Sequence, residues 1–152
     1  MKILFISMRS IHAIRWMENL INSNHQLYWF DILDRGEIPN LKNVHQITNW
    51  KQRKMTYIKG EHFLRKNTPS IYKKIQPYLE VTINEKLVQI LNEIQPDIVH
   101  SFEMQSCSYP ILETMHKFTK IKWLYNSWGN DIFYYQNIQS HKKQINQVLS
   151  RV

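Results

Sequence analysis

Three short segments of the sequence carry polar and aromatic side chains in patterns that suit ligand binding. The first is "SMRSIHAIRW" (7–16), which holds Arg9, His12 and Arg15. His12 and Arg15 are three residues apart, so they share a face if the segment is helical. A helix N-terminus attracts anions through its free N–H groups and its dipole, and the arginines strengthen that attraction. The segment is a candidate anion site, with a solvated basic turn as the alternative.

The second segment, "HSFEMQS" (100–106), offers a carboxylate, Glu103, for hydrogen bonds to ligand hydroxyl groups. The alternative is a glutamate that begins a helix and is stabilised by the helix dipole. His100 and Cys107 lie nearby, and their residue types allow a Cys–His nucleophile pair, although nothing in the sequence indicates an oxyanion hole.

The third segment is "NSWGND" (126–131), which contains one of only three glycines in the chain. Gly129 allows a positive φ or a close approach of the backbone to a ligand. Trp128 offers an apolar face with an N–H group, which suits a sugar ring or an acyl chain. Asp131 can accept hydrogen bonds from a ligand or cap the turn. The alternative is an ordinary turn after a strand, with a tryptophan in the core.

The elements that position these segments alternate along the chain. Apolar runs predict strands at 2–7, 25–32, 43–47, 97–102 and 122–127, and helical periodicity predicts helices at 10–24, 81–94, 108–118 and 139–150. This alternation predicts an α/β fold: a Rossmann-like, doubly wound, mostly parallel sheet with helices on both faces. Right-handed crossovers bring the C-terminal ends of the strands to one edge, where ligands of such folds bind. All three segments are expected at that edge.

Length and composition bound the class of protein. The 152 residues, 43% of them hydrophobic, suit one domain with a real core. A single cysteine excludes an internal disulfide and a multi-cysteine zinc site, and we expect a cytoplasmic setting. The chain has neither G-x-G-x-x-G nor G-x-x-x-x-G-K, which argues against dinucleotide-binding and P-loop proteins.

The net charge of +8 is concentrated in residues 51–74, which hold eight basic residues against Glu61 alone. This segment should be partly helical, with breaks near Gly60 and Thr68–Pro69. We expect it to contact an anionic membrane surface through basic side chains that include Lys51, Arg53, Lys54 and Lys59. The alternative function of the whole chain is a basic α/β module that binds nucleic acid through 51–74, where Trp50 and Tyr57 interleave with the charge. No RNA-binding motif supports it, so nucleic acid is not the expected partner.

The order of motifs resembles the N-terminal half of the family 4 glycosyltransferases, which are retaining enzymes of the two-domain GT-B fold. The motifs are "MKILFIS" (1–7), H-x-x-R-W from His12, Asn24–His25, "PDIVH" (96–100) and a G-x-D turn at Gly129–Asp131. The resemblance covers nearly the whole chain. It implies that residues 1–152 form the acceptor-side domain of a hexosyltransferase type of enzyme, with a role in polysaccharide biosynthesis.

The resemblance also implies a partner domain and substrates. The key glutamates and most contacts to the nucleotide-sugar lie in a C-terminal domain that this sequence lacks, so we expect a fragment that is inactive alone. The nucleotide-sugar is a co-substrate, and no separate cofactor or metal is implied. The expected acceptor is a glycan or a lipid-linked molecule, which would place the protein at the membrane periphery.

Roles for the candidate residues follow from the chemistry of such transfer. Arg9 and Arg15 suit stabilisation of the departing diphosphate, and Glu103 and Asp131 suit binding of acceptor hydroxyls. Two departures from the family pattern stand out: the first loop lacks glycine, and Trp128 occupies the position where many members have a histidine. No catalytic residue is therefore assigned.

Overall fold

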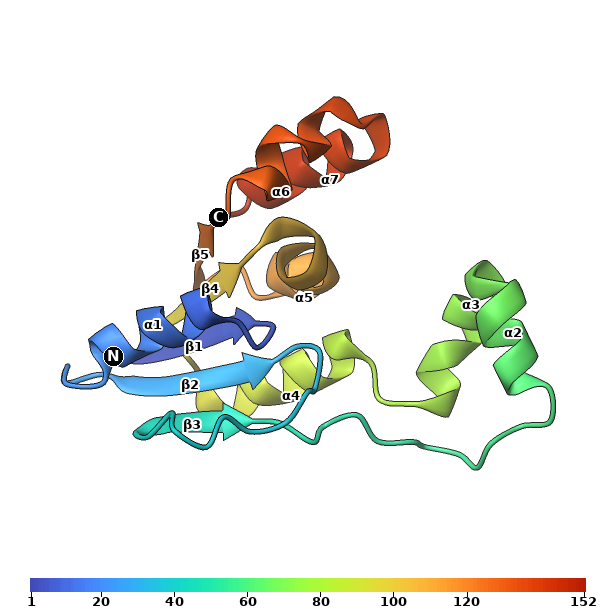
Figure 1. The fold of residues 1–152 in the computed structure, drawn as a ribbon, viewed down its shortest axis with the longest axis horizontal. Helices are drawn as coiled ribbons and strands as arrows, with labels where there is room; N and C mark the ends of the chain where they lie inside the picture. The colour runs from blue at the N-terminus through green and yellow to red at the C-terminus, as the bar shows by residue number, and fades with distance from the viewer.

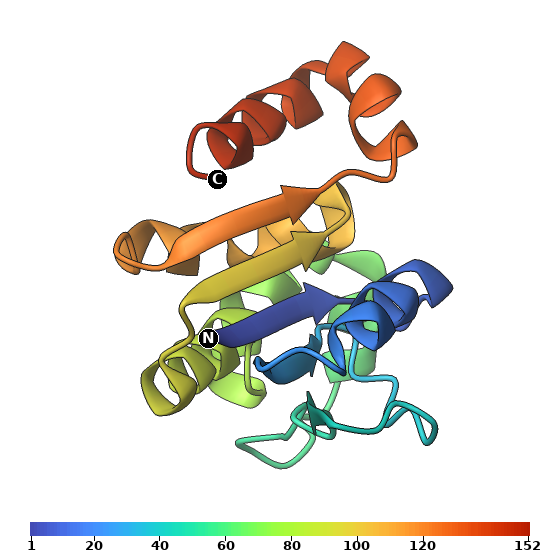
Figure 2. The same ribbon diagram turned by 90° about the vertical axis from the view of Figure 1, so that its left-hand side faces the viewer.

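The computed structural model describes all 152 residues and is built on one sheet of five parallel strands. The strands follow the order β3-β2-β1-β4-β5 across the sheet (Figures 1 and 2). Their bounds are β1 (Lys2–Ser7), β2 (Gln26–Asp31), β3 (Val44–Ile47), β4 (Ile98–Phe102) and β5 (Lys122–Asn126). Each predicted strand is present, within one residue at either end.

The chain winds outward from β1 in both directions, which makes the sheet doubly wound. In the register of the sheet, Leu4 of β1 lies beside Tyr28 of β2 and Val99 of β4. The strand order therefore reverses between β1 and β4, and the loops after these two strands diverge there. A reversal of this kind leaves a crevice at the C-terminal edge of the sheet.

Helices cover both faces of the sheet, which confirms the predicted Rossmann-like class. Alternate residues of β1 divide between two apolar clusters. Ile3 and Phe5 pack on the face of α1 (Ile11–Leu20), and Leu4 and Ile6 pack on the opposite face. That opposite face is covered by α4 (Ile83–Ile94), α5 (Leu112–Lys117) and α7 (Gln139–Leu149). Full burial of each such apolar side chain stabilises the fold by roughly 1.5–3 kcal/mol.

Capping residues set the starts of the two best-defined helices. The Ser10 hydroxyl accepts a hydrogen bond from Ala13 N at 3.2 Å, so α1 begins at Ile11, one residue inside the predicted range, and it ends at Leu20, four residues before the predicted end. Thr82 and Glu85 form a reciprocal capping box at the start of α4. The predicted helix 81–94 therefore begins two residues late, because Thr82 is its extended N-cap.

The segment after β4 differs from the predicted helix 108–118. It begins earlier, with a π-helical turn at Met104–Ser108 and a 3-10 turn at Tyr109–Ile111, and only then becomes α5. Glu103 starts this segment at a positive φ of 66°, and its backbone oxygen accepts from Ser108 N. That wide turn needs tertiary contacts, which periodicity does not report. Two short helices after Gly129, α6 (Asn130–Phe133) and a 3-10 turn (Tyr135–Asn137), were also not predicted.

The basic segment forms a helical hairpin inserted between β3 and α4. Residues 51–60 are not helical, and α2 (Glu61–Asn67) and α3 (Pro69–Leu79) follow, with breaks at Gly60 and Thr68 as predicted. Figure 1 shows the two helices at one end of the molecule, beyond the sheet. Arg53 and Glu80 form an antiparallel bridge, so the connections into and out of the hairpin run side by side.

No helix of the chain combines the length and the apolar character needed to cross a membrane.

Candidate functional site

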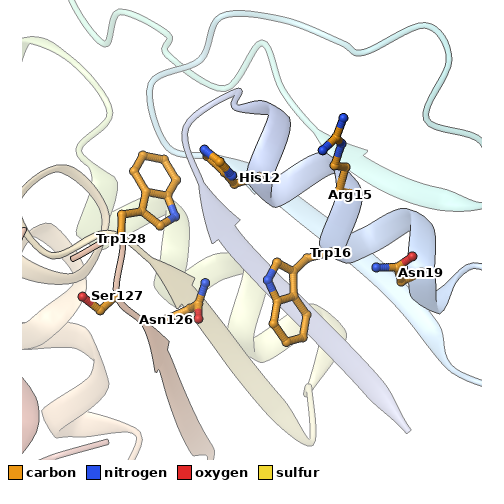
Figure 3. A pocket seen from close by; sticks show the side chains of 7 residues that line it. All are labelled: His12, Arg15, Trp16, Asn19, Asn126, Ser127 and Trp128. Carbon is orange, nitrogen blue, oxygen red and sulfur yellow. The ribbon is translucent and has the colours of Figure 1, made fainter. Parts of the chain in front are cut away.

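A groove of about 450 Å³ lies between α1 and the C-terminal end of β5. Helix α1 contributes four side chains to its lining, and the end of β5 with the following loop contributes three (Figure 3). These are His12, Arg15, Trp16, Asn19, Asn126, Ser127 and Trp128. The groove therefore joins the first and third segments singled out in the sequence.

The spacing along α1 explains its contribution. His12, Arg15, Trp16 and Asn19 follow the i, i+3, i+4, i+7 pattern and share one face of the helix. A neighbouring face buries Ala13 and Met17 against the sheet. The groove face is left free because that packing fixes the rotation of the helix.

A buried histidine supports the tryptophan of this face. The Trp16 ring meets His100 of β4 edge-on, with centroids 5.4 Å apart, and His100 stacks on Phe102 at 4.5 Å. Burial lowers the pKa of His100 to about 4, so the ring is neutral at pH 7. Trp16 nevertheless remains 46% exposed. One side of the Trp16 ring packs on His100, and the rest of the ring is open to the groove.

Asp131 organises the loop that carries Trp128. Its buried carboxylate accepts from Ser127 Oγ at 2.7 Å, from Trp128 N at 3.0 Å and from Met104 N at 3.1 Å. It also accepts a hydrogen bond from the Tyr125 hydroxyl. Burial raises the pKa of Tyr125, and the hydrogen bond to Asp131 raises it further. The carboxylate thus joins the loops after β4 and β5 and fixes the backbone of Trp128.

The five tryptophans divide into two groups by the partner of the indole N–H. Three donate within the protein: Trp29 to Ser7 Oγ at 2.9 Å, Trp50 to Asp31 O at 2.8 Å and Trp123 to Ser101 Oγ at 2.9 Å. The two in the groove, Trp16 and Trp128, donate to no protein atom. Trp128 Nε1 is moreover shielded from solvent. A shielded donor without a partner costs roughly 1–3 kcal/mol.

The structure brings three of the predicted ligand-binding residues together: His12, Arg15 and Trp128 line the groove, and the His12 and Trp128 rings lie 5.7 Å apart. Arg9 is exposed in the preceding loop and does not line the groove. Gly129 follows Trp128 in the chain and has a φ of 90°. That positive φ agrees with the predicted need for glycine.

The two predicted hydroxyl-binding carboxylates are engaged with the protein itself. Glu103 accepts from Gln105 N and Ser106 N and caps the π-helical turn, as the helix-start alternative describes. Asp131 likewise uses both oxygens on loop donors. Neither side chain lines the groove.

The Cys–His alternative has no support in the geometry. Cys107 is fully buried in the core on the face opposite α1, and burial raises the pKa of its thiol to about 12. A thiol of that pKa is not a thiolate nucleophile at neutral pH. Three or more His, Cys, Asp or Glu residues are nowhere grouped to hold a metal ion.

Three of the four predicted membrane-contact residues have internal partners. Lys51 Nζ donates to Leu33 O at 2.8 Å, and Lys54 pairs with Glu85 at 2.5 Å. The Arg53 guanidinium pairs with both oxygens of Glu61, at 2.7 and 2.8 Å. Of the four, only Lys59 has a side chain that forms no hydrogen bond or ion pair within the protein.

Sequence reasoning missed Trp16, Asn19, Asn126 and Ser127. The helical spacing from His12 contains the signal for Trp16 and Asn19, but a tryptophan next to Met17 fits the apolar stripe of the helix equally well. Asn126 and Ser127 stood in the third segment, which drew attention to Trp128, Gly129 and Asp131 instead.

The fold and the groove define a class: a Rossmann-like domain with an aromatic and amide-lined groove at the C-terminal edge of its sheet. Within that class, the chain belongs to the glycosyl transferase 4-like family, whose family model matches residues 2–151. No curated protein gives a significant match to the chain. The chain is thus a glycosyltransferase domain of the kind that its motif order resembles.

Proposed function

We propose that this chain forms the acceptor side of a retaining glycosyltransferase of the hexosyltransferase type. The enzyme would transfer a sugar from a nucleotide-sugar to a glycan or lipid-linked acceptor, in polysaccharide biosynthesis. The nucleotide-sugar is consumed as a co-substrate, so the proposal includes no separate cofactor. The observation that carries it is the pair of unpartnered indoles, Trp16 and Trp128, that face one groove in a glycosyltransferase domain.

The side chains of the groove match the surface of a sugar. An indole ring presents an apolar face to the C–H groups of a pyranose, and its N–H donates to a hydroxyl. Asn19 and Asn126 each add an amide that can donate to one hydroxyl and accept from another. Figure 3 shows the Trp128 indole nitrogen on the side of its ring that faces α1.

The cations of the groove suit the leaving group. Transfer breaks the bond between the anomeric carbon and the diphosphate, and negative charge grows on the diphosphate as the sugar becomes oxocarbenium-like. His12 lies in the first turn of α1 and Arg15 in the second, and neither side chain has a hydrogen-bond partner in the protein. Cationic groups near the departing diphosphate stabilise this charge as it develops.

Indole N–H resonances test the proposal directly, because three of the five tryptophans act as internal references. In ¹⁵N-correlated spectra, oligosaccharides or nucleotide-sugars should shift the Trp16 and Trp128 signals and leave those of Trp29, Trp50 and Trp123 in place. Trp16→Phe and Trp128→Phe assign the two signals. If neither signal moves with any sugar, or all five move together, the groove is not the sugar site.

Transfer itself is tested on the protein as the cell produces it. Labelled sugar should move from a nucleotide-sugar to glycan or lipid-extract acceptors, and Trp128→Phe should lower the rate while Trp50→Phe retains it. An equal loss in both variants would indicate a general packing defect and count against a role for the groove.

A further inference from the structure

The hairpin α2–α3 and the loop before it expose large apolar side chains with no covering element. Tyr57 is 78% exposed, Phe63 64% and Tyr78 73%. The three aliphatic or thioether side chains of this kind are Met55, Ile58 and Ile71, each at least half exposed. Six such residues within one small insertion are more than scattered surface apolar residues usually provide.

The hairpin has a packed interior of its own, so its exposed apolar residues lie on the outer surface of a folded element. Its interior is closed by Tyr72 and Leu79, and Glu61, only 5% exposed, binds Arg53 through both carboxylate oxygens. Tyr72 Oη also donates to Glu61, at 3.4 Å. On α3, Ile71 and Tyr78 are seven residues apart with Lys74 between them, so the three share an outward side of the helix.

Free positive charge accompanies these side chains. Five basic residues of the hairpin region form no ion pair: Lys59, Arg65, Lys66, Lys73 and Lys74. The single acidic residue among them, Glu61, is neutralised by Arg53. The surface therefore combines net positive charge with aromatic and aliphatic tips.

We propose that this surface, the exposed side chains of residues 55–78, docks the protein on an anionic lipid bilayer. The charges complement lipid phosphates, and the Tyr, Phe, Ile and Met tips enter the interfacial region, as those of interfacial amphipathic helices do. The inference rests on the proposed function in one respect: a lipid-linked acceptor lies at such a surface. The docking residues are those of the hairpin and not Arg53 or Lys54, which hold the hairpin together.

Nucleic acid is the less favoured occupant. Exposed isoleucine and methionine side chains are stabilised when they enter the apolar part of a bilayer, and they make no favourable contact with a phosphate backbone. Trp50, the aromatic residue expected to stack on bases, is buried and donates its indole N–H to Asp31 O. Base stacking needs exposed rings beside the charges, and here only the tyrosines and Phe63 remain for it.

Co-sedimentation of the chain with vesicles tests the proposal without any sugar substrate. Binding should appear with phosphatidylcholine vesicles that contain phosphatidylglycerol, should be near zero with phosphatidylcholine alone, and should weaken as salt is raised. Each basic residue at the surface contributes about fivefold in partitioning, so Lys59, Lys66 and Lys73→Gln together should lower it about 100-fold. Phe63 and Tyr78→Ser should also lower it, with all charges retained.

The matched control replaces Lys120, Lys142 and Lys143 by Gln, which makes the same charge change at exposed sites outside the hairpin. It should retain the binding of the unmodified chain, and so should Trp128→Ala, which affects only the groove. Cooperative urea unfolding should be retained in every variant. If the unmodified chain binds vesicles but no sugar, the proposed function alone is rejected.

Three results would overturn the docking proposal. One is that the unmodified chain ignores anionic vesicles at low salt, and another is that the control triple variant loses binding as fully as the hairpin variant. The third has two parts: single-stranded oligonucleotides displace the chain from vesicles, and the Lys59, Lys66 and Lys73→Gln variant no longer binds those oligonucleotides. That result would assign the surface to nucleic acid.

Discussion

Acidification should destabilise this domain through one buried histidine, His100 on β4. The ring lies between Phe5, Phe102 and Trp16, with centroids at 5.5, 4.5 and 5.4 Å, and it makes no hydrogen bond to the protein. Burial lowers its pKa in the folded state from 6.5 to about 4. The unfolded chain therefore takes up this proton more readily than the folded chain does.

The sign and size of the effect follow from proton linkage. The stability contributed by neutral His100 is complete above its unfolded pKa of 6.5 and is lost as the pH falls from there toward about 4. With these two pKa values, the free energy of unfolding should fall by about 2 kcal/mol between pH 7 and pH 5.

Urea unfolding, followed by tryptophan fluorescence at a series of pH values, measures this loss. The His100→Leu variant cannot take up the proton at this position. The free energy of unfolding of the unmodified protein should therefore fall by about 2 kcal/mol relative to that of the variant from pH 7 to pH 5. His116→Leu, at an exposed position on α5, controls for the loss of a histidine as such. If His100→Leu keeps the pH dependence of the unmodified protein, or if NMR titration finds the pKa of His100 near its ordinary value, the reasoning fails.

Two further predictions concern the loop that carries Trp128. Gly129→Ala should lower the free energy of unfolding by about 1 kcal/mol or more, because φ is positive there although an added Cβ meets no atom within 4 Å. The neighbouring Asn130→Ala should cost less in the same denaturation experiment, and equal costs would remove the backbone argument. Asp131→Asn should cost about 2–4 kcal/mol, because an amide N–H₂ would face buried donors. It should also shift the Trp128 indole resonance, and an unmoved resonance would show that the carboxylate does not position that ring.

The central strands were predictable because buried parallel strands are short, largely apolar and flanked by polar loops. Serine is likewise a residue type that favours helix N-caps, and Ser10 caps α1. The turn at Met104–Ser108 was not predictable, since it depends on Glu103 reaching forward to two backbone N–H groups and on Asp131 reaching back from the next loop. Contacts of that kind have no period in the sequence.

The candidate site was predictable only in part, for two physical reasons. Trp16 and Met17 are adjacent on the helix, and periodicity does not say which of two large apolar neighbours faces the core; Met17 does, and Trp16 lines the groove. Carboxylates at a sheet edge suit ligands and loop N–H groups equally well. Here the loops engage Glu103 and Asp131, and the groove is left with indoles and amides together with His12, Arg15 and Ser127.

The antiparallel bridge between Arg53 and Glu80 has a consequence for how this domain can be altered. Lys54 N donates to Leu79 O at 2.8 Å and Val81 N to Gln52 O at 2.9 Å, so the chain leaves the body and returns to it at adjacent points. A short turn could replace the intervening residues without moving a strand, because closing so small a gap costs little chain entropy. The insertion is thus a separable module: evolution or an engineer can exchange it, lengthen it or transplant it, while the Rossmann-like body and its groove stay the same.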